Sequence, residues 1–88
     1  MVKVVLPSVW AADGQTEFEV PAGLLHEVIK RFVADHPSYA RRLLGTDREP
    51  AGYINMCVGD TLIPRKSRAT TEVPEGSTVV LIPPMAGG

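Results

Sequence analysis

The first half of the chain shows two patterns of apolar positions, one with the period of a strand and one with the period of a helix. Residues 16–20 (TEFEV) alternate polar and apolar side chains, which is the pattern of a half-buried strand. A β-branched run at residues 2–6 precedes them, and turn residues at 12–15 separate the two, so we expect an opening hairpin. Over residues 24–35 the apolar positions recur at helical spacing, with charged residues on the opposite side. Pro37 ends this predicted helix, because the residue before a proline is disfavoured in the α region.

The second half predicts a short helix and three more strands. Residues 38–44 fit a short helix capped by Ser38. Residues 53–58 alternate again, and a Gly-Asp turn leads into a short strand at 61–63. Residues 78–82 form the last strand, apolar on both faces. Strands before and after one long helix indicate an α+β fold, with the helix covering one face of the sheet.

Composition narrows the class of protein. The chain has 88 residues, of which we assign 1–82 to one domain and 83–88 to a tail. Its formal net charge of −1 argues against general binding to nucleic acid or anionic lipid. One cysteine, Cys57, excludes an internal disulfide framework and suits a reducing compartment. With no long apolar run and no signal-peptide pattern at the N-terminus, we expect a cytoplasmic protein without a membrane segment.

The C-terminal residues PPMAGG are the main candidate for function. Pro83 and Pro84 cannot continue the ladder, and an extended segment 83–88 would reach about 20 Å from the sheet. Glycine has no Cβ, so a terminal diglycine can enter a narrow channel. Two glycines end a chain by chance only about once in 200 proteins. The candidate segment consists of Pro84, Met85, Ala86, Gly87 and Gly88.

Three stretches carry a family resemblance over nearly the whole chain. The ending LIPPMAGG, the turn and strand at 74–80 and the strand at 53–60 resemble the ThiS/MoaD group of ubiquitin-like sulfur carriers. The strand at 53–60 is most similar to that of the carriers of cysteine biosynthesis, whereas Pro83-Pro84 is also typical of the small subunit of molybdopterin synthase. The resemblance implies a β-grasp fold, with a mixed sheet of four to five strands packed on one main helix.

The resemblance also implies a function as a protein cosubstrate. A ubiquitin-activating-type enzyme would use ATP to adenylate the Gly88 carboxylate, which is then converted to a thiocarboxylate. A biosynthetic enzyme would accept the sulfur for cysteine or another metabolite, and in the cysteine version a metalloprotease releases the product. The chain itself would have no catalytic residue and bind no cofactor. Alternatives are a molybdopterin synthase small subunit, a protein modifier conjugated through Gly88, and an interaction domain with an idle tail.

Strand alternation also predicts a docking surface. If the inward positions face the helix, then Val5, Cys57, Val80 and Ile82 point outward and form an apolar patch beside the tail. They are alternatively strand formers shielded by their neighbours. Two basic clusters are either solvated or pair with acidic residues on a partner enzyme; their residues are Arg65, Lys66 and Arg68, and Arg41 and Arg42.

Other chemistry has little support in the sequence. Cys57 could relay sulfur, but its strand position favours a packing residue. His26 and His36 are ten residues apart and belong to no cluster with metal-ligand spacing, so no metal site is expected. No phosphate-binding loop or nucleophile elbow occurs, which argues against enzymatic activity of the chain itself.

Overall fold

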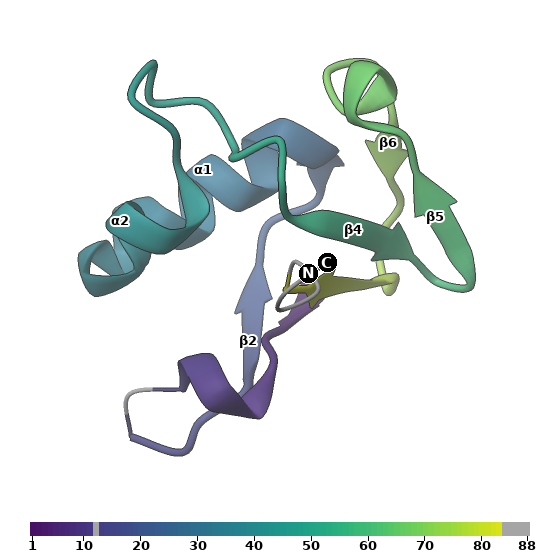
Figure 1. Cartoon of the computed structure of the whole chain (residues 1–88). Helices are drawn as coiled ribbons and strands as arrows, with labels where there is room; N and C mark the ends of the chain where they lie inside the picture. The colour runs from purple at the N-terminus through teal and green to yellow at the C-terminus, as the bar shows by residue number, and fades with distance from the viewer. Residues whose placement is uncertain (12, 84–88) are drawn as a thin grey trace.

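A five-stranded sheet forms the body of the protein (Figure 1). The computed structural model describes residues 1–11 and 13–83. The strand order is β2-β1-β7-β4-β5. β1 and β7 pair in parallel at the centre, and the other neighbours pair antiparallel, so the sheet is mixed as expected. The strands are β1 (Val2–Val5), β2 (Glu17–Val20), β4 (Asn55–Val58), β5 (Thr61–Ile63) and β7 (Thr78–Ile82).

One face of the sheet packs on helix α1 (Leu25–Asp35). The helical period seen in the sequence places its apolar side chains in the core, where Val28, Ile29 and Phe32 are fully buried. The helix ends at Asp35, and the N–H of the capping residue His36 still bonds to the carbonyls of Phe32 and Val33 before Pro37 redirects the chain. This helix–sheet arrangement confirms the predicted β-grasp fold.

The predicted second helix is shorter and begins differently. Pro37 starts a 3₁₀ turn, η2 (Pro37–Tyr39), which continues into α2 (Ala40–Leu43) beside α1. No side chain caps this segment, so the expected cap at Ser38 is wrong. Proline suits the first helical position because the missing N–H would have no partner there. Tyr39 buries its ring 6.2 Å from that of Phe18, which anchors the turn on β2.

Several short elements were not predicted. β3 (Gly23–Leu24) pairs antiparallel with β6 (Glu72–Val73) in a separate two-stranded sheet. Single turns of 3₁₀ helix follow β1 and β5 as η1 (Ser8–Trp10) and η3 (Arg65–Ser67). Elements of two or three residues are too short to show a hydrophobic period, so only the folded chain defines them.

Arg68 is buried, which corrects the expectation of a solvated basic side chain. Only 5% of it is exposed, and its guanidinium donates to the carbonyls of Ala51, at 3.0 Å, and Ile54. Burial, with a smaller effect of the nearby Arg65 charge, lowers the pKa of Arg68. Arg68 therefore holds the loop before β4 against the segment after β5, and it is not available as a surface contact.

Replacing Arg68 should test this structural role. Arg68→Met removes the guanidinium that donates to both carbonyls and leaves the Ala51 carbonyl with only the long bond from the Ile54 amide, so we expect a loss of about 3 kcal/mol in the free energy of unfolding. Urea denaturation followed by circular dichroism measures it. Lys66→Met, at a neighbouring exposed position, should change stability by less than about 0.5 kcal/mol. Equal stability of the two variants would contradict the role.

Adjacent positions of β7 should respond differently to one hydroxyl group. Val79 is fully buried, whereas Val80 is half-buried on the opposite face. Val79→Thr places a hydroxyl in the core and should cost about 2 kcal/mol of unfolding free energy, because the hydroxyl loses its water there. Val80→Thr should cost less than about 0.5 kcal/mol. The same denaturation experiment compares them, and a larger loss at Val80 would mean that the faces are assigned wrongly.

Candidate docking face and tail exit

The last strand carries the chain to its C-terminal segment from the middle of the sheet. β7 is bonded on one side to β1 and on the other to β4, where Ile82 pairs with Asn55. Pro83 follows and is the last residue that the structure describes. The predicted tail residues 84–88 lie outside the described residues. The point at which the tail leaves the domain is thus set by a central strand rather than by a loop.

Four strands place apolar side chains in one row across the outer sheet face. The pairing registers connect Val5 to Val80, Val80 to Cys57, and Cys57 to Leu62. Because paired residues point to the same face, these four side chains are neighbours on the side away from α1. Ile82 lies two residues beyond Val80 on the same face and is 38% exposed. We call these five residues the outer patch.

The outer patch confirms the predicted faces and adds a residue. Val5, Cys57 and Val80 are half-buried and Ile82 is exposed, whereas the alternating positions Val4, Met56, Val79 and Leu81 are buried. Leu62 is 56% exposed and was missed by sequence reasoning. The Gly59-Asp60 turn could have revealed it, because this turn sets the register of the hairpin in which Leu62 lies opposite Cys57.

The edge of the outer patch is charged. Glu17 pairs with Val5 across the β1–β2 ladder, so it continues the row on β2. Its carboxylate lies 3.2 Å from the ammonium of Lys3, which is on the same face. Both groups are largely exposed, so this ion pair contributes little to stability. An apolar centre with a polar rim is the usual make-up of a protein–protein interface.

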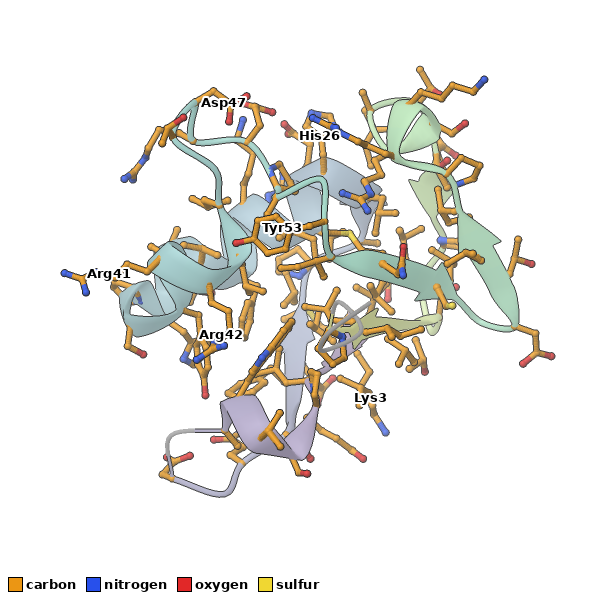
Figure 2. The ribbon with its side chains drawn as sticks, in the orientation of Figure 1. Lys3, His26, Arg41, Arg42, Asp47 and Tyr53 are labelled. Carbon is orange, nitrogen blue, oxygen red and sulfur yellow. The ribbon has the colours of Figure 1, made fainter. Side chains whose placement is uncertain are left out.

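A hollow of about 430 Å³ lies beside the tail exit. The guanidinium of Arg42 lies 5.3 Å from the centre of the Trp10 ring, and the hydroxyl of Tyr53 donates to the Arg42 carbonyl oxygen at 3.4 Å. Figure 2 shows that the two arginines of α2 extend in different directions, Arg41 outward at the edge of the molecule and Arg42 below the helix. We call it the exit hollow; its lining residues are Trp10, Arg41, Arg42, Tyr53 and Pro83.

The basic cluster of Arg65, Lys66 and Arg68 does not line the exit hollow. Arg65 is exposed, and its guanidinium lies over Gly52, where an added Cβ would come within 2.5 Å of it. Together with Arg68 and His26 it lines a separate cleft of about 220 Å³. Arg65 is therefore not part of the outer patch. Within this cluster Arg65 and Lys66 are exposed, whereas Arg68 is buried.

The described residues contain no other recognisable chemical centre. Cys57 is a half-buried free thiol within the outer patch. No group of three or more His, Cys, Asp or Glu side chains in residues 1–11 and 13–83 is arranged to hold a metal ion. No helix in this part of the chain is both long and apolar enough to cross a membrane.

Comparison with solved structures shows the same fold in three proteins. The Amycolatopsis orientalis BexX/CysO complex contains a chain that matches with a TM-score of 0.82 and 24% identity over 100% of both chains. Mycobacterium tuberculosis CysO gives 0.80 and 20% identity over 97% of this chain and 100% of its own. SAMP1 from Haloferax volcanii gives 0.76 and 20% identity over 99% and 98%. These similarities show the fold alone.

Sequence comparison gives the family. A search among curated proteins found no significant match. The model of the ThiS family, however, matches residues 10–88, which extend from the exit hollow to the terminal diglycine. The β-grasp fold, the central position of β7 and this match agree with the resemblance noted in the C-terminal residues. The chain therefore belongs to the ThiS family.

Proposed function

We propose that the protein is a sulfur carrier whose Gly88 carboxylate is converted to a thiocarboxylate. The observation that carries this proposal is the match to the ThiS family, which runs through the terminal Gly87-Gly88. The position of β7 supports it, since the strand directs the tail from a rigid sheet beside an exposed apolar patch. Small carriers of this kind are substrates of other enzymes, so the catalytic groups belong to the partners.

The chemistry explains why a carboxylate must be activated. A carboxylate is a poor electrophile because it is negatively charged and has no good leaving group. Attack of a Gly88 carboxylate oxygen on the α-phosphorus of ATP forms an acyl adenylate and releases pyrophosphate. Hydrosulfide then attacks the acyl carbon, the C–S bond forms, and AMP leaves with the activated oxygen. The thiocarboxylate that results is a strong, soft nucleophile attached to a protein.

The outer patch is proposed as the surface that both partners bind. An adenylating enzyme and a sulfur acceptor must each hold the domain while the tail reaches their reactive centre. The row Val5, Val80, Cys57 and Leu62 provides an apolar contact at a fixed distance from Pro83, because all four lie on paired strands. Rigid elements position such a contact better than loops do.

The acceptor is proposed to be a biosynthetic enzyme for cysteine or another sulfur-containing metabolite. Two of the similar structures contain CysO proteins, which supports this choice over molybdopterin synthesis, for which Pro83-Pro84 is the only signal. In the cysteine version, a metalloprotease would release the product from the tail. A second candidate function is protein modification, because the similar SAMP1 of Haloferax volcanii is a small archaeal modifier protein.

Intact mass measures the proposed reaction directly. The chain is incubated with ATP, a sulfide source and the ThiS-activating enzyme encoded in the same genome. We expect a mass increase equal to the replacement of one oxygen by sulfur. Deletion of Gly88 should abolish the increase, and Gly88→Val should reduce it strongly, because its side chain obstructs the narrow channel. Unchanged mass of the wild-type chain would refute the sulfur-carrier function.

The modifier function predicts a different product. Conjugation through Gly88 would leave a Gly-Gly remnant on lysines of other proteins, which peptide mass spectrometry of a cell digest detects. Such remnants without any thiocarboxylate would favour the modifier over the carrier.

A charge in the outer patch should weaken activation. Leu62→Glu places a carboxylate on the exposed edge strand β5, and we expect kcat/KM for adenylation to fall by about tenfold or more because the charge would be desolvated in the complex. Ala34→Glu adds the same charge on an exposed position of α1 and should leave kcat/KM within about twofold. Equal rates for the two variants would remove the outer patch from the interface.

A further inference from the structure

Arg41 and Arg42 are exposed cations that no carboxylate of the described chain neutralises. Lys3 and Lys30, in contrast, have carboxylate partners at 3.2 and 2.8 Å. Neither arginine forms an ion pair within residues 1–11 and 13–83. Both residues line the exit hollow, and none of the lining residues within 1–11 and 13–83 is acidic. Two exposed arginines without an ion pair in the described chain therefore lie at the hollow that Pro83 also lines.

Arg42 is held in place before any partner arrives. Its guanidinium lies over the ring of Trp10, a residue that is only 8% exposed, so the cation is placed against the packed core. The Tyr53 hydroxyl bonds to the Arg42 carbonyl and thereby connects α2 to the loop before β4. A pre-positioned guanidinium loses less conformational entropy on binding than a free lysine would.

Charge is distributed unequally along β7. The end at which the strand begins lies beside the turn at Asp60, where the Gly59 amide bonds to the Thr78 carbonyl, and near Glu75, whose carboxylate is paired with the Met1 ammonium. The end at which it finishes lies beside Arg41 and Arg42. An acidic surface would therefore be attracted to the second end rather than to the first. Such a field orients the tail toward an acidic partner during encounter, although the net charge is only −1.

We propose that the exit hollow binds an acidic segment of the activating enzyme, with a carboxylate paired to Arg41 or Arg42. This inference rests on the proposed carrier function and names the chemistry of its first partner. Pro83 lines the hollow, so an enzyme that encloses the following residues must come against it. Arginine pairs with a carboxylate through two parallel hydrogen bonds, and the exposed Tyr53 ring provides an apolar contact for the rest of the segment.

The experiment measures adenylation with the chain as the varied substrate. Arg41→Glu/Arg42→Glu is compared with wild type, using the ThiS-activating enzyme from the same genome and following pyrophosphate release. At about 0.05 M NaCl we expect KM for the chain to rise at least about tenfold, with kcat and KM for ATP unchanged within about twofold. At about 0.3 M NaCl the difference should shrink, since salt screens exposed charges.

Two further variants separate this role from loss of structure or of net charge. Arg31→Glu/Arg48→Glu makes the same change in net charge at exposed positions that do not line the hollow, and should leave KM within about twofold. Arg41→Gln/Arg42→Gln removes the charges without reversing them and should give a smaller rise in KM. The thermal unfolding midpoint of each variant should match that of wild type. If Arg41→Glu/Arg42→Glu unfolds at a lower temperature, the glutamine variant takes its place in the comparison.

Three outcomes would overturn the inference. The first is an equal effect of the two charge reversals, which would mean that net charge alone matters. The second is a rise in KM for ATP in place of KM for the chain, which would mean that the arginines contact the nucleotide. The third is a lack of adenylation of the wild-type chain at any salt concentration. That result would refute the carrier function itself and the inference with it, whereas the first two leave the carrier function intact.

Discussion

The pairing of β7 between β1 and β4 is the constraint on which the other features depend. Because β7 is bonded on both sides, each of its residues is committed to one face of the sheet. Val79 and Leu81 contact the core under α1, and Val80 and Ile82 lie on the outer face. The same pairing aligns Val80 with Val5 and Cys57. Core, outer patch and tail exit are thus three results of one register.

Elements with a clear hydrophobic period could be predicted from the sequence. The main helix, the strands of the large sheet and the inward and outward faces of β7 all follow from alternation or helical spacing. The predicted start of the second helix, with a cap at Ser38, was wrong because Pro37 was interpreted only as the end of α1. Proline is equally suited to a first helical position, and the local sequence does not distinguish the two roles.

The candidate site could be predicted only in part. The outer patch followed from alternation, but Leu62 joined it through a register that depends on the β4–β5 turn. The exit hollow combines η1, α2 and the loop before β4, which are distant in sequence. Arg68 is the opposite case: a charged residue between polar neighbours predicts exposure, and only the carbonyls of Ala51 and Ile54 explain its burial. The terminal residues that suggested the function lie outside the described structure.

The parallel pairing of β1 with β7 also determines at what stage of synthesis the domain can fold. The Lys3 amide bonds to the Ser77 carbonyl, and the Gly76 amide bonds to the Met1 carbonyl, so the two ends of the domain meet at the centre of the sheet. The chain loses the entropy of closing this long loop before the stabilising contacts between β1 and β7 can form. Without β7, the sheet lacks the strand at its centre. During synthesis, the sheet therefore stays incomplete until residues 78–82 have left the ribosome. A folded copy is, for that reason, a copy that carries the strand leading to its tail.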